Sequence, residues 1–463
     1  TYDASKLPKA CLQQPSANSP QDQSEDCLFM NIYTPQTAQP TSKLPVFVWV
    51  HGGSFLTGST KELDGFALAN SQNMIVVTVQ YRLGYFGWLK YDPWGVEGNM
   101  GLRDLVLALE TIQQDIGAFG GDSSLVTLAG QSSGAQMIKA LLSTPSAISL
   151  FHRAILHSAP LDYSPQVPAL ANAVGSAFLF DIAGCTKQKS ACLWRLKTPQ
   201  EFFQAQGTLV YAALAGTFGD SVPFAEPFNI VADGDLVSGD GQTVLSSDKG
   251  IIFTTVKDEG CPAVALAQVF LSFAWHLSTA ELSTDEIIYA FFGGRAPAIL
   301  GSGLYTSEGA DSATAETNFV QLATDFYWTC PNQRFAADAA AKSTVYLGEF
   351  DLGIQAATSA SFPLCQNKVG HEDDISVVFD NRSSSLSSAQ SNLVKEVQAR
   401  WGAFVRSGNP NAPSSSAGGY SNWPALPRDG SGLKVLQLGA TSNGASSLTT
   451  SQRSEACKLY DSI

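Results

Sequence analysis

Long apolar runs are missing from this sequence. A helix that crosses a membrane needs about 20 consecutive, mainly apolar residues. The longest candidate, residues 74–89, is interrupted by Gln80, Arg82 and several glycines. We therefore expect a soluble chain without a transmembrane segment.

Positive charge is also scarce. The 463 residues include 27 Lys and Arg against 41 Asp and Glu, which gives a formal net charge of −14. A chain with this excess of negative charge repels the phosphate backbone of nucleic acids. The composition therefore argues against a nucleic-acid partner.

Cysteine pairs of the C-x-x-C type are absent. The eight cysteines are even in number and spread along the chain, which favours disulfide bonds over a zinc site. The chain begins at Thr1 rather than Met, as a processed secreted protein would, although an artificial boundary would look the same. With a glycosylation sequon at Asn381-Arg382-Ser383, these features predict a secreted, extracellular protein.

The abundant residues predict a large α/β protein. Hydrophobic residues make up 44% of the chain and charged residues 15%, enough for a sizeable core. Short β-branched runs alternate with helical patterns, which is typical of a mainly parallel sheet with helices on both faces. Strands are expected at residues 46–50, 74–79, 125–129, 154–156, 251–256 and 344–347, and helices at residues 102–116, 137–142 and 393–405.

One segment does not follow this alternation. Residues 161–250 contain weak strand signals and many Phe, Ala and Pro residues. We therefore expect this segment to leave the sheet and to form a cap or pocket wall. It would belong to a single domain that spans residues 1–463.

A pentapeptide between a predicted strand and a predicted helix suggests an enzyme. Gly130-Gln131-Ser132-Ser133-Gly134 follows the apolar run at residues 125–129. In a strand-to-helix elbow, the serine is held on a strained turn, and the flanking glycines leave room for neighbouring backbone. Ser132 is the candidate nucleophile, although an isolated G-x-S-x-G also occurs by chance.

Only five histidines are available as the base for this serine. His371 is the preferred candidate, because it lies in a polar loop that follows a predicted strand. The other four lie beside strands, in an apolar helical stretch or before a glycine pair, where structural roles are more common: His51, His152, His157 and His276.

The acid that orients the histidine should lie at the end of a strand. Lys257-Asp258-Glu259-Gly260 follows the strand at residues 251–256, and either Asp258 or Glu259 would serve. A surface turn would also explain this tetrapeptide. The chain order Ser, acid, His is nevertheless the order expected for α/β-hydrolases.

A glycine-rich loop adds a further part of such a site. His51-Gly52-Gly53-Ser54-Phe55 follows the strand at residues 46–50, and its glycines allow backbone N–H groups to approach a ligand closely. Groups of this kind form the oxyanion hole that stabilises the transition state of acyl transfer.

Further motifs extend along nearly the whole chain. In order, they are Ser24-Glu25-Asp26-Cys27-Leu28, the His51 loop, Tyr81-Arg82-Leu83-Gly84-Tyr85-Phe86-Gly87, Gly98-Asn99-Met100-Gly101-Leu102-Arg103-Asp104, Phe119-Gly120-Gly121-Asp122, the Ser132 elbow, Lys257-Asp258-Glu259-Gly260, the His371 loop and Trp401-Gly402-Ala403-Phe404. Together they resemble the carboxylesterase type B family, which includes cholinesterases, carboxylesterases and secreted fungal lipases and esterases. The resemblance implies an α/β-hydrolase fold and no metal or organic cofactor.

Position by position, the resemblance also assigns roles. It implies Ser132 as nucleophile, Glu259 rather than Asp258 as acid, and His371 as base. The oxyanion donors that it implies are the backbone N–H groups of Gly53, Ser54 and Ser133.

Three residues depart from the family's pattern. Ser54 replaces a usual third glycine, Gln131 a usual glutamate, and Ser133 a usual alanine. The loss of the glutamate's charge should reduce the attraction of the site for cationic substrates. The Ser54 hydroxyl should crowd the acyl site or hydrogen-bond within it.

The N-terminal region departs from the family as well. Cys11 and Cys27 match the family's first disulfide, but the loop between them has only 15 residues (27 − 11 − 1) and no tryptophan. Cholinesterases place a choline-binding tryptophan in this loop, and the best-known lipases use a long flap, so neither is favoured. The family's N-terminal hairpin is absent, which indicates either its cleavage or a shortened variant of the fold.

The remaining six cysteines form three predicted pairs. One pair matches the family's second disulfide. A second follows from the triad, because Cys261 lies just after Glu259 and Cys365 just before His371. The predicted pairs are Cys185–Cys192, Cys261–Cys365 and Cys330–Cys457.

The sequence therefore predicts a carboxylic ester hydrolase that acts on neutral, small-molecule esters through a serine acyl-enzyme. A triacylglycerol lipase or a sterol or feruloyl-type esterase of the same family is the alternative. A non-catalytic binding protein on the same fold is less favoured, because those typically lack a triad residue.

Overall fold

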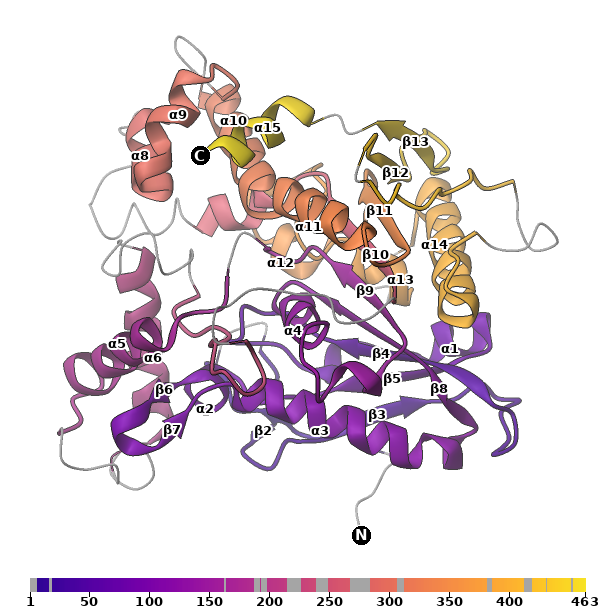
Figure 1. The fold of residues 1–463 in the computed structure, drawn as a ribbon, viewed down its shortest axis with the longest axis horizontal. Coiled ribbons are helices and arrows are strands. Elements are labelled where there is room, and N and C mark those ends of the chain that lie inside the picture. The colour runs from indigo at the N-terminus through magenta and orange to yellow at the C-terminus, as the bar shows by residue number, and fades with distance from the viewer. Residues whose placement is uncertain are drawn as a thin grey trace.

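The computed structural model describes residues 6–15, 19–161, 164–186, 192, 198–214, 226–238, 249–266, 284–305, 312–380, 385–411, 419–429, 431–450 and 453–463. Its centre is a nine-stranded sheet with the order β13-β12-β11-β10-β9-β8-β4-β5-β3 (Figure 1). The strands of this sheet are β3 Met30–Tyr33, β4 Leu44–Val50, β5 Ile75–Val79, β8 Gly121–Gln131, β9 Arg153–His157, β10 Gly250–Val256, β11 Val345–Phe350, β12 Lys434–Leu438 and β13 Ser447–Thr450.

The sheet is parallel except at its two ends. The strand pairs from β5 to β12 are parallel, whereas β3 pairs with β5, and β13 with β12, in the antiparallel sense. In a parallel sheet the carboxyl ends of the strands meet at one edge, where α/β proteins bind their ligands. Two short ribbons are separate from this sheet, formed by β1 Ala10–Cys11 with β2 Gln23–Ser24 and by β6 Lys90–Tyr91 with β7 Val96–Glu97.

Side chains of each central strand point to alternate faces and bury two cores. Val46, Val48 and Val50 of β4 belong to one core, and Phe47 and Trp49 belong to the other. The first core includes apolar residues of the helices α3 (Met100–Asp115) and α4 (Ser133–Leu141). The second includes apolar residues of α1 (Phe66–Gln72), α13 (Ile375–Phe379) and α14 (Ser388–Ser407). Strands that are buried on both faces are continuous apolar runs, which explains why the pattern of the sequence is clear here.

The helices lie on both sides of the sheet (Figure 1). Their bounds are α1 Phe66–Gln72, α2 Gly84–Trp88, α3 Met100–Asp115, α4 Ser133–Leu141, α5 Pro168–Ser176, α6 Pro199–Leu214, α8 Thr284–Phe292, α9 Ala296–Gly301, α10 Ser312–Ala323, α11 Cys330–Ala340, α12 Ala357–Ala360, α13 Ile375–Phe379, α14 Ser388–Ser407 and α15 Ser454–Ser462. Two π-helical segments, Ala177–Ile182 and Thr324–Thr329, continue α5 and α10.

The six predicted strands correspond to β4, β5, β8, β9, β10 and β11, and the three predicted helices to α3, α4 and α14. α14 ends at Ser407, just before Gly408, whose φ of 78° requires the left-handed conformation that glycine adopts readily. Within the main sheet, β12 and β13 at one end have no counterpart among the predicted strands, because polar residues interrupt their apolar runs. A mainly parallel sheet with helices on both faces is thus confirmed.

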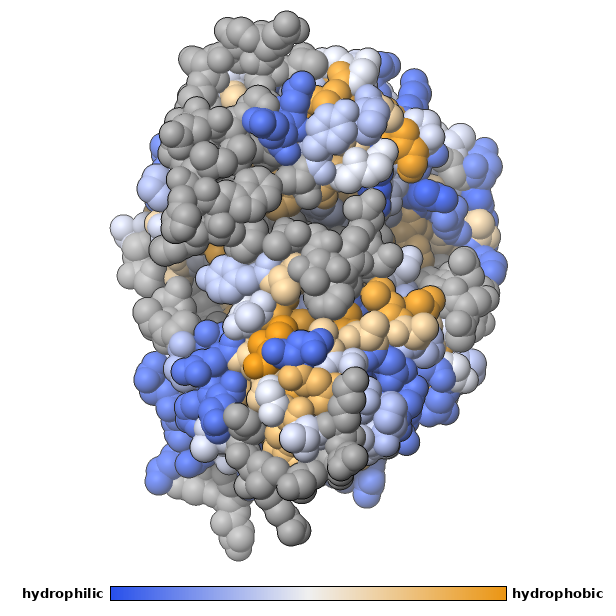
Figure 2. Space-filling model, turned by 90° about the vertical axis from the view of Figure 1, so that its left-hand side faces the viewer, coloured by the Kyte–Doolittle hydropathy of each residue, from blue (hydrophilic) through white to orange (hydrophobic). Residues whose placement is uncertain are grey.

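The segment at residues 161–250 adds only the first residue of β10, Gly250, to the main sheet within its described part. It contains α5 and α6, which lie together at one side of the molecule, away from β12 and β13 (Figure 1). On this side, apolar side chains gather in a band between hydrophilic regions (Figure 2). Within this segment, a short parallel bridge joins Gln166 to Val231.

Four disulfides cross-link the chain: Cys11–Cys27, Cys185–Cys192, Cys261–Cys365 and Cys330–Cys457. They are the same pairs that the sequence predicts. No helix in the described part of the chain is long and apolar enough to cross a membrane.

Candidate active site

The Ser132 elbow lies at the carboxyl end of β8. Ser132 is the residue between β8 and α4, and its φ of 54° and ψ of −126° lie outside the regions that most residues adopt. Two backbone bonds hold this strained turn: the Ser132 N–H donates to the carbonyl of His157 at 2.9 Å, and the Ser132 carbonyl accepts from the Gln136 N–H at 3.0 Å. Strain of this kind persists only where the surroundings fix the backbone, and it is typical of functional sites.

The glycines of the elbow are required by close backbone contacts. A Cβ atom on Gly134 would lie 2.4 Å from the carbonyl oxygen of Val50 and 2.6 Å from that of His51. A Cβ atom on Gly130 would lie 2.9 Å from the same Val50 oxygen. These distances are below the contact limit, so the two glycines allow β8 and α4 to pack against β4.

Glu259 contacts His371 across a long separation in sequence. The Nδ1 atom of His371 lies 2.5 Å from Oε2 of Glu259, which is fully buried, and the second carboxyl oxygen of Glu259 accepts the N–H of Val256 at 2.9 Å. A carboxylate in this position fixes the imidazole with its proton on Nδ1 and leaves Nε2 free to accept a proton. This is the orientation that a general base requires.

Asp258 has a different task from its neighbour. Its backbone N–H donates to the carbonyl of Val369, and its Oδ2 atom accepts the Val369 N–H at 3.1 Å. A parallel bridge between Asp258 and Gly370 continues this pairing. Asp258 therefore ties the loop after β10 to the loop of His371, whereas Glu259 contacts the imidazole. The contact with the imidazole is thus made by Glu259 and not by Asp258.

The charges around His371 favour its protonated form. Burial lowers the pKa of His371, but the carboxylate of Glu259, and more weakly those of Glu372 and Asp374, outweigh burial and raise this pKa above its usual value. A more basic imidazole is a stronger proton acceptor from a serine hydroxyl, provided that the pH leaves it unprotonated.

Gln131 makes an unexpected contact with the imidazole. Its side-chain nitrogen lies 3.0 Å from Nε2 of His371, and no hydrogen bond joins the Ser132 hydroxyl to His371 among the described residues. With Nδ1–H directed at Glu259, the Gln131 amide donates to the lone pair of Nε2. The sequence identified Gln131 as a departure from a family pattern but gave no sign of this contact.

The loop after β4 lies against the elbow. Gly53, Ser54 and Phe55 have φ values of 110°, 52° and 61°, a run of left-handed conformations that is rare outside glycine. A Cβ atom on Gly52 would lie 2.9 Å from Cβ of Ser132, which shows how closely the loop approaches the serine.

Three backbone N–H groups of this region point to a shared role. Within the described residues, the N–H groups of Gly53, Ser54 and Ser133 donate no hydrogen bond, whereas that of Phe55 donates to the Ser133 hydroxyl at 3.3 Å. The three groups that the family resemblance implies as oxyanion donors are therefore free to bind a ligand.

The other histidines have structural surroundings. His51 stacks on Tyr81 at 4.4 Å between ring centroids, and burial lowers the pKa of His51 to about 4. His152 accepts a hydrogen bond from the backbone of Val126. His276 lies outside the described residues, as does Asn381 of the predicted sequon.

His157 forms a second buried pair behind the elbow. Its Nδ1 atom lies 2.7 Å from Oδ2 of Asp374, three residues after His371, and its Nε2 accepts the indole N–H of Trp401 at 3.1 Å. Because Nε2 is an acceptor, the imidazole is neutral and donates from Nδ1 to the carboxylate. His157 thus supports Ser132 through its carbonyl and the His371 loop through its side chain.

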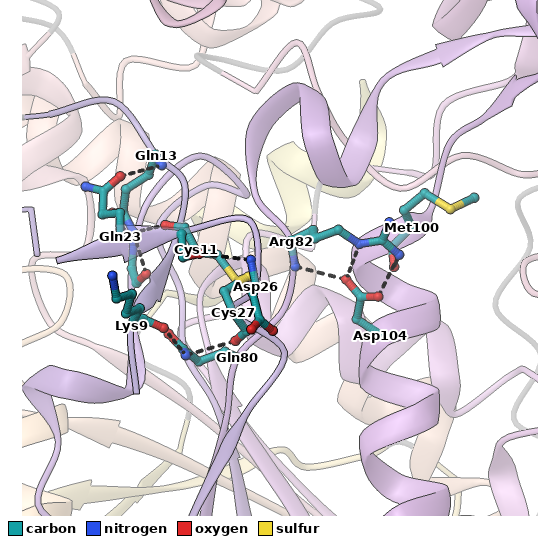
Figure 3. The surroundings of a disulfide bond; sticks show 12 residues. Lys9, Cys11, Gln13, Gln23, Asp26, Cys27, Gln80, Arg82, Met100 and Asp104 are labelled. Carbon is teal, nitrogen blue, oxygen red and sulfur yellow. Dashed lines mark hydrogen bonds and ion pairs between the residues drawn. A yellow bond between two sulfur atoms is a disulfide. The ribbon is translucent and has the colours of Figure 1, made fainter. Parts of the chain in front are cut away.

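The disulfide Cys11–Cys27 lies beside a separate hollow. The side-chain nitrogen of Gln80 donates to the carbonyls of Lys9 and Cys27, and Arg82 forms a two-pronged ion pair with Asp104 (Figure 3). The neighbouring pocket has a volume of about 490 Å³ and is lined mainly by apolar side chains, with neither Ser132 nor His371 among its lining residues.

The described residues include no group of three or more His, Cys, Asp or Glu side chains that could hold a metal ion. The site consists instead of a serine on a strained elbow, a buried carboxylate on an imidazole, and free backbone N–H groups.

Comparison with known proteins identifies the family. Residues 1–459 match the family model that is described as the carboxylesterase family. The chain belongs to the carboxylesterase family. It is accordingly a serine carboxylic ester hydrolase with an α/β-hydrolase fold.

Relatives of this carboxylesterase cover most of its length. Carboxylesterase 1D of Rattus norvegicus is 30% identical, in an alignment that covers 93% of this chain and 76% of the rat protein. A medium-chain fatty acyl-CoA hydrolase precursor of Anas platyrhynchos is also 30% identical, over 92% of this chain and 74% of its own length. The solved structure of a thermophilic PNB esterase shares the fold, with a TM-score of 0.75 and 24% identity over 98% of this chain and 88% of that one.

Proposed function

We propose that Ser132, His371 and Glu259 are the nucleophile, base and acid of this carboxylesterase. The observation that carries the proposal is the 2.5 Å contact between His371 and the buried Glu259, on a loop pair that lies beside the Ser132 elbow. The match of the chain to the carboxylesterase family, for which a serine triad is typical, supports a triad of this kind.

In the proposed reaction, Oγ of Ser132 forms a bond to the ester carbonyl carbon while its proton passes to Nε2 of His371. The negative charge on the carbonyl oxygen is stabilised by the N–H groups of Gly53, Ser54 and Ser133. The bond to the alcohol oxygen then breaks, and His371 returns the proton to the leaving alcohol. Water repeats these steps on the acyl-enzyme and releases the acid.

During this cycle the side-chain amide of Gln131 has to move away from Nε2 of His371. Its amide donates to the lone pair that must accept the serine proton, at 3.0 Å from Nε2. Catalytic hydrogen bonds are often long without substrate and shorten when substrate binds. We therefore propose that the Ser132 hydroxyl replaces the Gln131 amide at Nε2 in the substrate complex.

The substrates that we propose are neutral carboxylic esters. Gln131, which contacts the imidazole, carries no charge, so the site lacks an anionic partner for a cationic alcohol at this position.

Two further proposals concern the chain as a whole. The first is that residues 1–463 form one domain, in which the segment 161–250 forms a wall of the substrate pocket. The second is that the protein is secreted and glycosylated at Asn381. The four disulfides support secretion, because such bonds persist in oxidising compartments.

The assignment of the triad is tested by replacing Ser132 with Ala. We expect kcat for 4-nitrophenyl butyrate to fall by about a million-fold, as in other serine hydrolases, and an organophosphate probe to label only the unchanged protein. A Ser132→Ala variant that keeps a near-native rate would show that another residue is the nucleophile.

The secretion proposal is tested by peptide mass analysis of protein from culture medium, in which N-glycosidase should change the mass of the Asn381 peptide.

A further inference from the structure

A buried carboxyl group lies beside the proposed oxyanion hole. Glu226 is only 3% exposed, and it belongs to the segment between α6 and β10, far in sequence from the catalytic loops. An acidic residue is rarely buried to this degree unless its carboxyl has specific partners. The contacts of Glu226 therefore indicate what the group is for.

Those contacts connect Glu226 to two parts of the site. Its carboxyl lies near the side chain of Ser54, in the loop after β4, and near that of Gln136, one helical turn after Ser132, and both side chains favour its charged form. The side-chain amide of Asn229 approaches the same carboxyl at 3.5 Å. Glu226 thus lies next to the residue whose backbone N–H is a proposed oxyanion donor and next to the helix that begins at the nucleophile.

The surroundings keep this carboxyl partly protonated at neutral pH. Burial raises the pKa of Glu226 to about 7, although Ser54, Gln136 and the nearby His371 favour the charged form. A neutral carboxyl offers one O–H donor as well as acceptor oxygens, so it can hydrogen-bond an uncharged hydroxyl in either sense. Gln136 contributes another polar atom, because its Oε1 is buried without a partner in the described part of the chain.

The geometry points to a polar surface, formed by Glu226 and Ser54, that recognises a hydroxyl group of the substrate. On the basis of the proposed function, we propose that Glu226 and Ser54 are specificity-determining residues, which select carboxylic esters that carry a hydroxyl group within a few bonds of the reacting carbonyl. A hydrocarbon group in the same place would leave buried polar atoms without partners. Sites built in this way discriminate strongly against the analogue that lacks the hydroxyl.

Two matched pairs of esters test this proposal. The first pair is the butyrate and the 3-hydroxybutyrate of 4-methylumbelliferone, and the second is the butyrates of propan-1-ol and propane-1,2-diol. For each pair, the ratio of kcat/KM for the hydroxylated ester to that for the plain ester is measured. We expect wild type to prefer the hydroxylated ester in at least one pair by about tenfold, the scale of one additional hydrogen bond.

The variants separate hydrogen bonding from charge. Glu226→Leu should reduce the preferred ratio about tenfold while the plain ester is still hydrolysed, whereas Glu226→Gln, which keeps size and hydrogen bonding, should retain most of the preference. Ser54→Ala keeps the backbone N–H and should reduce the ratio in the same direction, and it carries the test if Glu226→Leu does not fold. Organophosphate titration of each variant shows that the serine is still reactive.

Three outcomes would overturn the proposal. One is a wild-type protein without preference in both pairs, and another is an unchanged ratio in both Glu226→Leu and Ser54→Ala. The third is a preference of wild type for butyrylcholine over its neutral 3,3-dimethylbutyl isostere that Glu226→Gln abolishes, which would make Glu226 an anionic site. A nucleophile other than Ser132 would instead appear in the Ser132→Ala experiment, so failure of the triad assignment is distinguishable.

Discussion

At the residue scale, the proton on His371 governs the pH at which the site works. The proposed base must be unprotonated, and the nearby carboxylates hold its pKa above the usual value of about 6.5 despite burial. We therefore expect kcat/KM to rise with pH and the midpoint of this rise to lie above pH 6.5. Rates for a neutral aryl ester between pH 5 and 9 measure this midpoint, and a midpoint well below 6.5 would contradict the assignment.

Neighbouring acidic residues provide a matched test of the same assignment. Glu259→Gln removes the charge at 2.5 Å from Nδ1, so we expect kcat to fall by about 10⁴ and the acidic limb to move to lower pH. Asp258→Asn keeps an oxygen that can accept the Val369 N–H, and its rate should stay within about fivefold of wild type. An equal loss of kcat in the two variants would show that activity depends on the conformation of the loop rather than on the carboxylate of Glu259.

Some residues of the site follow from the sequence and others do not. Ser132 and His371 lie in local patterns that single them out, but the choice of Glu259 over Asp258 needed either the family resemblance or the structure. The contact between Gln131 and His371 joins residues 240 positions apart, and no local pattern encodes it. Glu226 had a local signal, an acidic residue within an apolar stretch, but only the fold shows its neighbours.

At the scale of elements, the disulfide Cys261–Cys365 connects the loop of the acid to the segment that leads to the base. It closes a sequence separation of 104 residues, and a loop of this size corresponds to about 4.7 kcal/mol of lost entropy in the unfolded chain. We expect the double variant Cys261→Ala/Cys365→Ala to be less stable by a few kcal/mol, roughly 2 to 5. Its kcat should also fall, because Glu259 and His371 lose a shared constraint.

The short disulfide provides the control for this change. Cys185→Ala/Cys192→Ala opens a separation of only seven residues, so its entropic effect should be smaller and its kcat should stay near wild type. Chemical denaturation and ester hydrolysis are measured on both variants. An unchanged kcat in the Cys261/Cys365 variant would show that Asp258 and the sheet hold the two loops without the disulfide.

The elements also show where local patterns are informative. Central strands such as β4 are buried on both faces, so every residue must be apolar and the run is unmistakable. The strands at the ends of the sheet, such as β13 Ser447–Thr450, alternate between partly exposed and exposed residues. Their pairing partners, rather than their composition, make them strands, and a local pattern cannot supply the partner.

At the scale of the whole molecule, the buried acidic residues and the net negative charge both make the fold less stable as the pH rises. Burial raises the pKa values of Glu226, Glu349 and Asp373 to about 7, whereas these carboxyls titrate near pH 4 in an unfolded chain. Each group therefore stabilises the fold fully below pH 4, and this contribution is lost as the pH rises through 7. The net charge of −14 adds self-repulsion at neutral pH.

His51 has the opposite effect on stability over part of the pH range. Its pKa of about 4 in the fold is below its unfolded value, so its stabilising contribution is lost as the pH falls from 6.5 towards 4. Three carboxyls nevertheless outweigh one imidazole at pH 5.5, and we expect Tm at pH 5.5 to exceed Tm at pH 8 by about 5 °C. Calorimetry on wild type and Glu226→Gln checks this, because the amide of the variant cannot titrate and its Tm should depend less on pH. A Tm that is highest at pH 8 would mean that these buried carboxyls are ionised in the fold.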